Sequence, residues 1–282
     1  MINVKNLAFS YTKAPFMEDI NFNVPKGEIF GFLGPSGAGK STLQKILTGL
    51  ILGYRGNAIV NGIEVKNRDN SFYENIGVDF EFPSLYEKLT ARQNLKFFGS
   101  LYSKQLSDID SLLNAVGLDR DADKKISEYS KGMKSRLNFI KALLHNPDIL
   151  FLDEPTSGLD PANARTMKDM ILTEKTKGKT IILTTHNMQD ATELCDRVAF
   201  IVDGKIKVMD SPHSLIMLKG ANKIEYSYIE NGIKKKSNCL IAETVKDKTL
   251  NLLIASGNLR SIHSCEPTLN DIFIEVTGRK LE

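Results

Sequence analysis

Glu28-Ile-Phe-Gly-Phe-Leu-Gly-Pro-Ser-Gly-Ala-Gly-Lys-Ser-Thr42 is the stretch of this chain that decides the fold. Residues 28–33 are mostly apolar and predict a short strand. Residues 34–41 then match the pattern G-x-x-x-x-G-K-S. Apolar side chains continue at helical spacing, at Leu43, Ile46, Leu47 and Leu50. A strand, a glycine-rich loop and a helix in this order predict a site that holds phosphate groups.

The residues of this loop have distinct predicted parts in holding a polyphosphate. Gly34, Gly37 and Gly39 allow the backbone to curl so that successive N–H groups point inward. The helix that begins near Lys40 adds the positive end of its dipole. Lys40 supplies a full charge to the β- and γ-phosphates, and the Ser41 hydroxyl is a ligand for Mg²⁺. The predicted nucleotide-binding residues are Gly34, Pro35, Ser36, Gly37, Ala38, Gly39, Lys40, Ser41 and Thr42.

The overall composition limits the kind of protein that carries this loop. The 282 residues leave room for one large domain and a small one. Because 37 Lys and Arg residues nearly balance 34 Asp and Glu residues, charge gives no argument for a nucleic-acid partner. Cys195, Cys239 and Cys265 are widely separated and form no C-x-x-C pair, which argues against a disulfide framework and a zinc site and fits a reducing compartment. There is neither a signal peptide nor an apolar run of about 18 residues, so we expect a soluble chain that reaches a membrane only through a partner.

The rest of the first half alternates between strand-like and helix-like patterns. Strand-like or apolar runs occur at residues 2–9, at 20–24, at 58–65 around the turn Asn61-Gly62, and at 76–82, where Pro83 ends the run. Residues 90–118 carry apolar side chains at helical spacing and predict a helical insertion with exposed loops. Tyr11 has two open interpretations, a half-buried strand tyrosine or a platform on which an adenine ring stacks.

A second strong signal begins at Ser130, which is a good N-cap for a helix with an apolar stripe down to Leu144. Residues 149–154 then form an apolar strand that ends in Asp153 and Glu154. Ligands in parallel sheets collect at the carboxyl ends of strands. We therefore expect Asp153 to hold Mg²⁺ beside Ser41, and Glu154 to orient or deprotonate a water that attacks the γ-phosphate.

A third strand of the same form, residues 180–186, ends in His186. The other histidines, His145, His213 and His263, do not follow a strand of this form and are interpreted as surface or packing residues. Residues 198–208 predict a closing hairpin around Asp203-Gly204.

Taken in order, these pieces resemble the nucleotide-binding subunit of ATP-binding cassette (ABC) transporters over roughly residues 1–215. The motifs that carry the resemblance are Walker A (34–41), a signature-like segment (Tyr129–Met133), Walker B (149–154), a D-loop (157–160, with Asp160) and the switch histidine His186. Tyr11 falls where the family has its adenine-stacking aromatic. The resemblance implies an α/β fold of the P-loop NTPase ABC ATPase type. Such a fold has a mixed core sheet flanked by helices, an antiparallel β subdomain and a helical subdomain.

Two segments depart from the family pattern. The signature LSGGQ is replaced by a form in which Lys131 and Met133 stand for Gly and Gln, while Ser130 and Gly132 are retained. This form is similar to that of ABC-2-type, multidrug-exporter-like proteins whose membrane subunit is a separate chain. The Q-loop offers Glu81 where most members have glutamine, and a carboxylate there can still be a ligand for Mg²⁺.

The tail resembles the same exporter branch. Residues 266–278 predict a helix with Pro267 near its start and Gly278 past its end. Before it, residues 223–229 and a strand near residues 250–254 suggest a small α+β appendage, with Asn231-Gly232 as a hairpin turn. We therefore expect an ATPase domain over residues 1–219 and an accessory domain over 220–282.

The resemblance implies an enzyme that hydrolyses ATP with Mg²⁺, with Glu154, His186 and Lys40 as catalytic residues. In the family each ATP lies between Walker A of one subunit and the signature of a second, so Ser130, Lys131, Gly132 and Met133 would act in trans. The implied partners are a second copy, most simply in a homodimer, and a transmembrane permease subunit whose helix would enter a groove beside residues 80–102. The chain would then lie on the cytoplasmic face of the cell membrane and power export. An ABC-type ATPase acting on nucleic acid or the ribosome is the alternative, and an idle regulatory subunit is a third.

Overall fold

The computed structural model describes residues 1–82, 84–219, 223–230 and 232–279, and it divides into two compact units. The first runs from Met1 to Met209 and the second begins at Asp210. This division comes earlier than the expected boundary at 219/220, because helix α8 (Pro212–Lys219) packs against helix α10 (Leu269–Thr277) of the tail. Within the described residues, no helix combines the length and the apolar character that crossing a bilayer requires.

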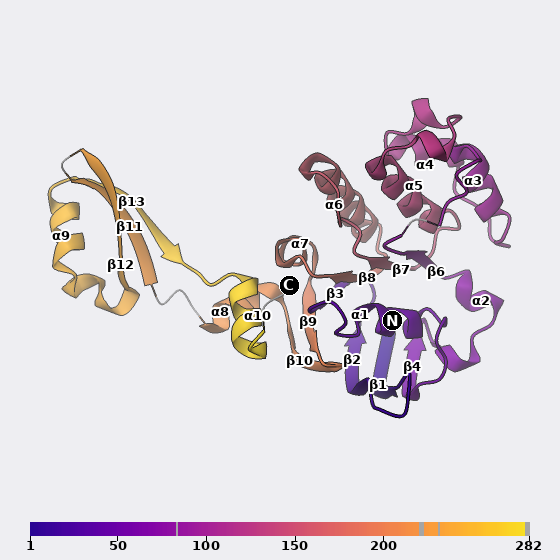
Figure 1. Cartoon of the computed structure of the whole chain (residues 1–282), viewed down its shortest axis with the longest axis horizontal. Coiled ribbons are helices and arrows are strands. Elements are labelled where there is room, and N and C mark those ends of the chain that lie inside the picture. The colour runs from indigo at the N-terminus through magenta and orange to yellow at the C-terminus, as the bar shows by residue number, and fades with distance from the viewer. Residues whose placement is uncertain (83, 220–222, 231, 280–282) are drawn as a thin grey trace. The chain divides into compact units, whose positions relative to one another are not determined.

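The first unit is built on two sheets (Figure 1). The larger has the strand order β10-β9-β3-β8-β7-β6, and the smaller has the order β2-β1-β4-β5. The strands of the larger sheet are β3 (Ile29–Leu33), β6 (Ile76–Asp79), β7 (Ile149–Asp153), β8 (Thr180–Thr185), β9 (Arg197–Val202) and β10 (Lys205–Asp210). Those of the smaller sheet are β1 (Ile2–Phe9), β2 (Met17–Val24), β4 (Arg55–Val60) and β5 (Ile63–Glu64). The predicted hairpins around Asn61-Gly62 and Asp203-Gly204 are thereby confirmed.

The larger sheet is parallel where it carries the site. Strand β3 pairs in parallel with β8 and β9, and β7 pairs in parallel with β6 and β8. Strands β3 and β7 are buried at every residue, which explains why their sequences are continuous apolar runs. Because parallel strands end at one edge, the residues that follow β3, β6, β7 and β8 meet there.

Helix α1 (Lys40–Leu47) lies between the two sheets, with contacts to β4 on one side and to β7 and β8 on the other. Its buried face includes Leu43, Ile46 and Leu47, in the spacing that the sequence shows. These side chains join one core with Leu7 and Ile20 of the smaller sheet. The core therefore fixes the first residue of α1, and with it the phosphate loop, against the edge of the larger sheet.

The helical insertion predicted for residues 90–118 is confirmed (Figure 1). It comprises α3 (Ala91–Gly99) and α4 (Ile109–Ala115), which lie beside α5 (Lys131–Leu143). The remaining helices of this unit are α2 (Asn70–Tyr73), α6 (Pro161–Thr176) and α7 (Met188–Leu194), with short 3₁₀ turns at Val65–Asn67, Asp119–Asp121 and Ile126–Glu128.

The apolar run predicted for residues 76–82 is a strand only as far as Asp79. After Asp79 the chain leaves the sheet, and Nδ2 of Asn138, on α5, donates a hydrogen bond to the carbonyl oxygen of Phe80 at 3.3 Å. Pro83, predicted to end the run, lies outside the described residues.

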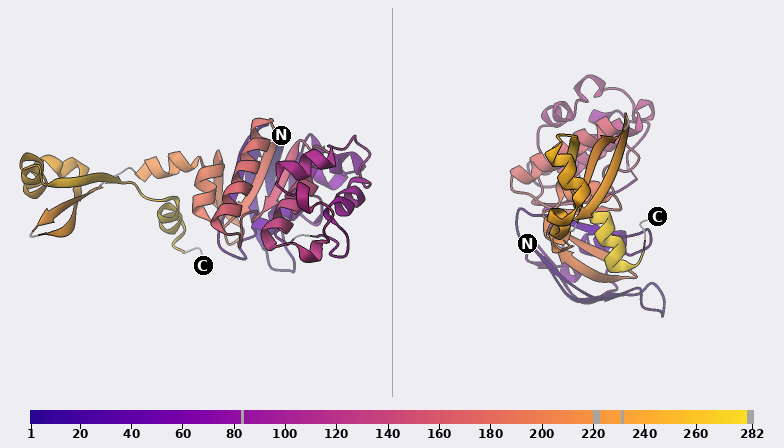
Figure 2. Two further views of the ribbon diagram at one scale, coloured as in Figure 1. Left: turned by 90° about the horizontal axis from the view of Figure 1, so that it is seen from above. Right: turned by 90° about the vertical axis from the view of Figure 1, so that its left-hand side faces the viewer.

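Besides α8 and α10, the second unit contains a three-stranded sheet with a helix packed on one face (Figures 1 and 2). The strand order is β12-β11-β13, from β11 (Lys223–Glu230), β12 (Ile233–Leu240) and β13 (Leu259–Cys265). Ile224 and Tyr226 of β11 form a small core with Leu250. The expected hairpin between β11 and β12 is present, although Asn231 of its turn lies outside the described residues.

The strand predicted near residues 250–254 is wrong: this segment belongs to α9 (Lys248–Ala255), which follows a 3₁₀ turn at Ile241–Lys246. The side chain of Asp247 caps the helix by accepting a hydrogen bond from the Leu250 backbone N–H at 2.9 Å. Leu250 and Leu253, three residues apart, face the sheet. A short apolar run fits a strand or a helix equally well, and here the cap decides.

The helix predicted over residues 266–278 is confirmed as α10. Thr268 caps its start in a reciprocal pair with Asp271, and Gly278 ends it with a φ of 68°.

His145 is a packing residue, as interpreted from the sequence, and it gives a prediction for acid stability. Its Nε2 lies 2.8 Å from the carbonyl oxygen of Ile76, and its ring stacks on Tyr102 with centroids 3.7 Å apart. Burial lowers the pKa of His145 to about 4. As the pH falls, the unfolded chain takes up this proton first, at its ordinary pKa of about 6.5.

The stability that neutral His145 contributes is therefore expected to disappear between about pH 6.5 and about pH 4, by up to about 3 kcal/mol. Urea unfolding near pH 7 and near pH 5 measures this loss. His145→Gln should flatten the pH dependence, whereas His263→Gln, at an exposed position of β13, should not. An equal slope in all three proteins would show that His145 is not its source.

Candidate functional site

The phosphate loop occupies the turn between β3 and α1. Gly34 packs so closely on β9 that a Cβ atom there would overlap the carbonyl oxygen of Ile201. Gly39 is the N-cap of α1 in a left-handed conformation, with a φ of 109°. These two glycines allow the loop to lie flat against the sheet and to present its backbone N–H groups ahead of the helix. The N-terminus of α1 thereby becomes a binding place for an anion.

Lys40 is the first residue of α1, and its ammonium folds back over the loop. Its Nζ donates hydrogen bonds to the carbonyl oxygens of Gly34 at 2.6 Å and Pro35 at 3.1 Å. Burial lowers the pKa of Lys40, and the carboxylates of Glu154, Asp153 and Glu81 oppose that shift. The cation is thus poised over the loop and surrounded by negative groups.

Asp153 and Glu154 stand at the end of β7, as predicted. Asp153 is buried, and its Oδ1 accepts hydrogen bonds from Ser41 Oγ at 3.2 Å and from Thr184 Oγ1. Glu154 has a φ of 50°, a left-handed conformation that is costly for a residue with a side chain. Its backbone N–H donates to the Thr184 carbonyl at 3.0 Å, which helps to hold the turn that directs the carboxylate out of the sheet.

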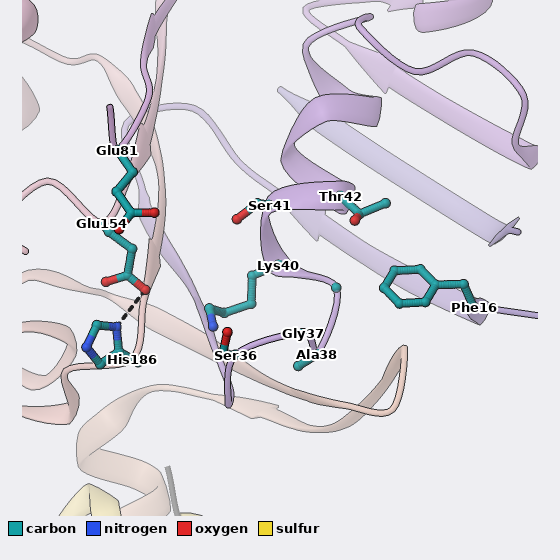
Figure 3. A pocket seen from close by; sticks show the side chains of 11 residues that line it. Phe16, Ser36, Gly37, Ala38, Lys40, Ser41, Thr42, Glu81, Glu154 and His186 are labelled. Carbon is teal, nitrogen blue, oxygen red and sulfur yellow. Dashed lines mark hydrogen bonds and ion pairs between the residues drawn. The ribbon is translucent and has the colours of Figure 1, made fainter. Parts of the chain in front are cut away.

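His186 follows β8 and meets Glu154 across the edge of the sheet. Its Nδ1 lies 2.9 Å from Glu154 Oε1. Figure 3 shows Glu81, Glu154 and His186 on one side of the cavity and Ser41, Thr42 and Phe16 on the other. Residues separated widely in the sequence are therefore brought together at the carboxyl ends of neighbouring strands.

These groups enclose a cavity of about 390 Å³ in front of the loop. Its size suits a small-molecule ligand such as a nucleotide. It is lined by Phe16, Ser36, Gly37, Ala38, Gly39, Lys40, Ser41, Thr42, Glu81, Glu154 and His186. Most of the predicted nucleotide-binding residues face one space, while Gly34 and Pro35 form the floor through which Lys40 is anchored.

Of the three expected ligands of Mg²⁺, Ser41 and Glu81 line this cavity, and Asp153 is hydrogen-bonded to Ser41. The hydrogen bond between Ser41 and Asp153 places a hydroxyl and a carboxylate oxygen side by side. Glu81 adds a second carboxylate to the cavity wall. Hard oxygen donors of this kind, together with phosphate oxygens, are the set that Mg²⁺ prefers, so the residues present fit the ion.

Asp79 is a buried carboxyl next to this site that the sequence interpretation missed. It lies at the end of β6, 5 % exposed, and burial raises its pKa to about 7. Asn138 donates a hydrogen bond to it from α5. An aspartate at a strand end looks like a surface residue in sequence, and only the packing of α5 shows otherwise.

The aromatic residue that lines the cavity is Phe16, which the sequence interpretation also missed. Tyr11 is 60 % exposed and lies beside the cavity, where its hydroxyl is 2.9 Å from Thr42 Oγ1. The two rings are in edge contact, with centroids 5.2 Å apart. The sequence does hold a signal for Phe16, because it is a second aromatic residue, after Tyr11, between β1 and β2.

We therefore expect Phe16→Ala to weaken ATP binding by roughly 10-fold, because stacking of a base on an aromatic ring contributes about 1–3 kcal/mol. Tyr11→Ala tests the stacking role predicted for that residue, and Tyr11→Phe removes only the contact with Thr42. A fluorescent ATP analogue measures all three affinities. An unchanged affinity in Phe16→Ala together with a loss in Tyr11→Ala would assign the adenine to Tyr11.

The signature-like segment lies outside this cavity. Ser130 caps α5 by accepting a hydrogen bond from the Met133 N–H at 3.2 Å, which confirms it as the N-cap. Lys131 leans over Gly158, where a Cβ atom would overlap its Nζ. Lys131 also lines a small cavity of about 40 Å³ with Asp153 and Glu154. The helix therefore has an exposed start, and this start does not line the cavity in which the same subunit would bind phosphate.

Asp160, the predicted D-loop residue, is the N-cap of α6. Its Oδ1 accepts hydrogen bonds from the N–H groups of Ala162 and Asn163, each at 3.1 Å. Like the signature-like segment, it does not line the cavity at the loop. The structure brings together the loop, Glu81, Glu154 and His186, whereas residues 130–133 and 160 do not line this cavity.

Comparison with known proteins agrees with this geometry. Residues 17–157 match the family model described as ABC transporter. A fluoroquinolones export ATP-binding protein of Mycobacterium tuberculosis is 46 % identical over all of this chain and 94 % of its own length. A lantibiotic transport ATP-binding protein of Streptococcus pyogenes is 39 % identical over 73 % of this chain and 89 % of its own.

Solved structures give the same result. The ATP-binding subunit of an ABC transporter aligns with a TM-score of 0.70 and 30 % identity over 78 % of this chain and 93 % of its own. A dimeric ATP-binding cassette in a post-hydrolysis state, bound to ADP and Pi, aligns with a TM-score of 0.67 and 25 % identity, over 75 % of this chain and 98 % of its own. The predicted fold, with its mixed sheet, antiparallel subdomain and helical subdomain, is confirmed, and the chain belongs to the ABC transporter family as an ATP-binding subunit.

Proposed function

We propose that this chain hydrolyses ATP with Mg²⁺ and that two copies, bound to a separate membrane subunit, use the reaction to power export. The observation that carries the proposal is the contact between Glu154 and His186 in the cavity of the phosphate loop. A carboxylate held by a second group, opposite a loop that binds phosphates, is the arrangement that an attacking water requires.

The cavity supplies each part of the reaction from its own residues. The loop N–H groups, the dipole of α1 and Lys40 hold the β- and γ-phosphates. Glu154 takes a proton from the water that attacks the γ-phosphorus, and His186 holds the carboxylate in place and meets the γ-phosphate. When bound at Ser41, Asp153 and Glu81, Mg²⁺ neutralises charge that develops on the phosphate oxygens.

The exposed signature-like segment supports a dimer. Ser130 is exposed and Gly132 is buried at the start of α5, and neither lines the cavity of its own subunit. In a homodimer they would close the second side of the partner's ATP, where the dipole of α5 favours a phosphate. Lys131 would add a positive charge there.

A groove on the helical side supports a membrane partner. It is a cavity of about 190 Å³ beside residues 80–102, with Tyr73, Val78, Phe98 and Tyr102 among its lining residues. Exposed Leu50 extends its apolar rim. We propose that a helix of the permease binds in this groove and carries the motion of the ATPase to the membrane. The names of the relatives refer to two different cargoes, fluoroquinolones and lantibiotics. We therefore propose that the permease, and not this chain, selects the cargo.

The deciding experiment is purification of this chain from its native membrane in mild detergent, followed by identification of what accompanies it. A multi-span protein in equal amount is the expected result, and it would provide the subunit in which to search for cargo. If the chain is recovered with ribosomes or DNA, the ABC-type ATPase acting on nucleic acid is correct and the export proposal is wrong. Recovery of the chain without any membrane protein would contradict the export proposal as well.

A further inference from the structure

Two side-chain contacts join the segment that follows β7 to the segment that follows β8. The first is the contact between Glu154 and His186 in the nucleotide cavity. The second lies outside that cavity, where the hydroxyl of Thr156 donates a hydrogen bond to Oδ2 of Asp190 at 2.6 Å. Thr156 follows Glu154 by two residues and Asp190 follows His186 by four, so both contacts join the same two segments.

The surroundings of Glu154 and His186 do not by themselves fix the contact between them. The side chain of His186 is 56 % exposed, so packing does not hold its ring. Glu154 has a φ of 50°, and a backbone in this conformation costs about 1–3 kcal/mol and persists only where neighbouring structure holds it. The geometry of the pair therefore depends on what holds the chain on either side of it.

The hydrogen bond between Thr156 and Asp190 lies where it can hold that geometry. Asp190 is 5 % exposed and belongs to the first turn of α7, where the N-cap Asn187 accepts a hydrogen bond from its backbone N–H at 3.2 Å. The backbone N–H of Glu154 donates to the Thr184 carbonyl at 3.0 Å. The strained residue is thus bonded to β8 through its own N–H, and the chain two residues later is bonded to α7 through Thr156.

Lys168, on α6, allows the Asp190 carboxylate to be buried. Its Nζ lies 3.2 Å from Oδ1 of Asp190 and 2.5 Å from Oε2 of Glu193. The hydrogen bonds to Glu193 and to Asp190 raise the pKa of Lys168, so it remains a cation. A buried ion pair often stabilises a fold no more than apolar side chains of similar volume. What a carboxylate provides at this position, and an apolar side chain does not, is an acceptor for the Thr156 hydroxyl.

We propose that Asp190 is a positioning residue that, through the Thr156 hydroxyl, fixes α7 to the turn after β7 and so holds Glu154 and His186 in contact. Its consequence for catalysis rests on the proposed function. Neither Thr156 nor Asp190 lines the nucleotide cavity. Neutralising Glu193 leaves the bond between Thr156 and Asp190 in place, so Glu193 has no part in this role.

The most specific variant is Thr156→Val, which removes the hydroxyl and keeps the shape of the side chain. Thr156→Ser keeps the hydroxyl and should therefore restore the behaviour of the unaltered chain. Asp190→Ala removes the acceptor, and if the loss of the partner of Lys168 prevents folding, Thr156→Val still tests the proposal. Thr192→Val is the matched control, because Thr192 is an exposed residue of α7 whose hydroxyl donates to the Met188 carbonyl of its own helix at 2.8 Å. Thermal unfolding and a calorimetric titration with ATP show whether each variant is folded and binds nucleotide.

The first measurement is ¹⁵N NMR of the histidine rings in the full chain without nucleotide. The chain has four histidines, and the signal of His186 is identified by its loss in His186→Gln. Glu154→Ala gives the position of this signal when the ring has no carboxylate beside it. In Thr156→Val and Asp190→Ala the signal should move towards that position, whereas in Thr156→Ser and Thr192→Val it should stay where it is in the unaltered chain.

The second measurement is ATP turnover. A misplacement of about 1 Å can cost up to about 100-fold in rate, so we expect kcat to fall roughly 10-fold in Thr156→Val and Asp190→Ala at an unchanged ATP affinity. The double variant should be no slower than the slower single variant, because both substitutions remove one hydrogen bond. Thr156→Ser and Thr192→Val should keep kcat within a factor of about two of the unaltered chain, since the bond remains.

A His186 signal that does not move in Thr156→Val would overturn the positioning role and leave the ATPase proposal standing. A signal that moves while kcat is unchanged would equally overturn it, because the contact would then not matter to the reaction. If the unaltered chain hydrolyses no ATP, the proposed function fails, and the catalytic part of the inference fails with it even where the signal moves.

Discussion

Replacement of Glu154 by glutamine is expected to lower ATP turnover by roughly 10²–10⁴-fold, which is the usual effect of losing a general base. Glutamine keeps the size of the side chain and a hydrogen-bond acceptor for His186, but it cannot take a proton from the attacking water. Binding of ATP should persist, because Lys40 and the loop are unchanged. Steady-state phosphate release measures turnover, and a calorimetric titration measures affinity.

Glu193→Gln is the matched control for this variant. Glu193 is a carboxylate of α7 that pairs with Lys168 at 2.5 Å and does not line the cavity. Its replacement should leave turnover within a factor of about two, because Glu193 is outside the site of the reaction. Turnover at the parent rate in Glu154→Gln would show that Glu154 is not the base. Slow hydrolysis should also prolong the ATP-bound dimer, which light scattering would detect.

Replacement of Lys40 by alanine is expected to weaken ATP binding by roughly 10–100-fold, because a hydrogen bond to a charged group contributes about 1.5–3 kcal/mol. The ammonium is held over the loop by Gly34 and Pro35, so its position is set before the phosphates arrive. Its loss should affect the triphosphate more than adenosine, which has no charge for Lys40 to meet.

Lys45→Ala is the matched control, because Lys45 is an exposed lysine in the last turn of the same helix. It should bind ATP as the unaltered chain does. Calorimetric titration of both variants, with thermal unfolding as the measure of folding, separates a lost contact from a lost fold. Equal affinities in Lys40→Ala and the unaltered chain would exclude the phosphate-loop role.

Much of the site was predictable because its parts are local in sequence. The curl of residues 34–39, the first turn of α1 and the polar ends of β7 and β8 each depend on side chains within a few residues. The same is true of the cap at Ser130, which the structure bears out. Such signals can be recognised without knowledge of the fold, because their physical cause lies in the segment itself.

The errors have one cause, which is that a pattern can fit two structures. Leu250 to Ile254 fits a strand by composition, but the cap at Asp247 and the spacing of Leu250 and Leu253 make it a helix. The apolar run from Ile76, for which the sequence alone gives no end of the strand before Pro83, is a strand only as far as Asp79. A local cap and the contact of the helix with the sheet decided the first case.

The sequence by itself determined that this chain has a phosphate loop, a strand ending in two carboxylates and a histidine at the end of a third strand. Local backbone geometry and the order of the motifs are sufficient for that. Only the tertiary structure decided that Phe16 lines the cavity, that Glu154 meets His186, and that Asn138 reaches Asp79 across 59 residues. These are contacts between elements that are distant in the chain, and they exist because the parallel sheet gathers strand ends at one edge and α5 packs beside it.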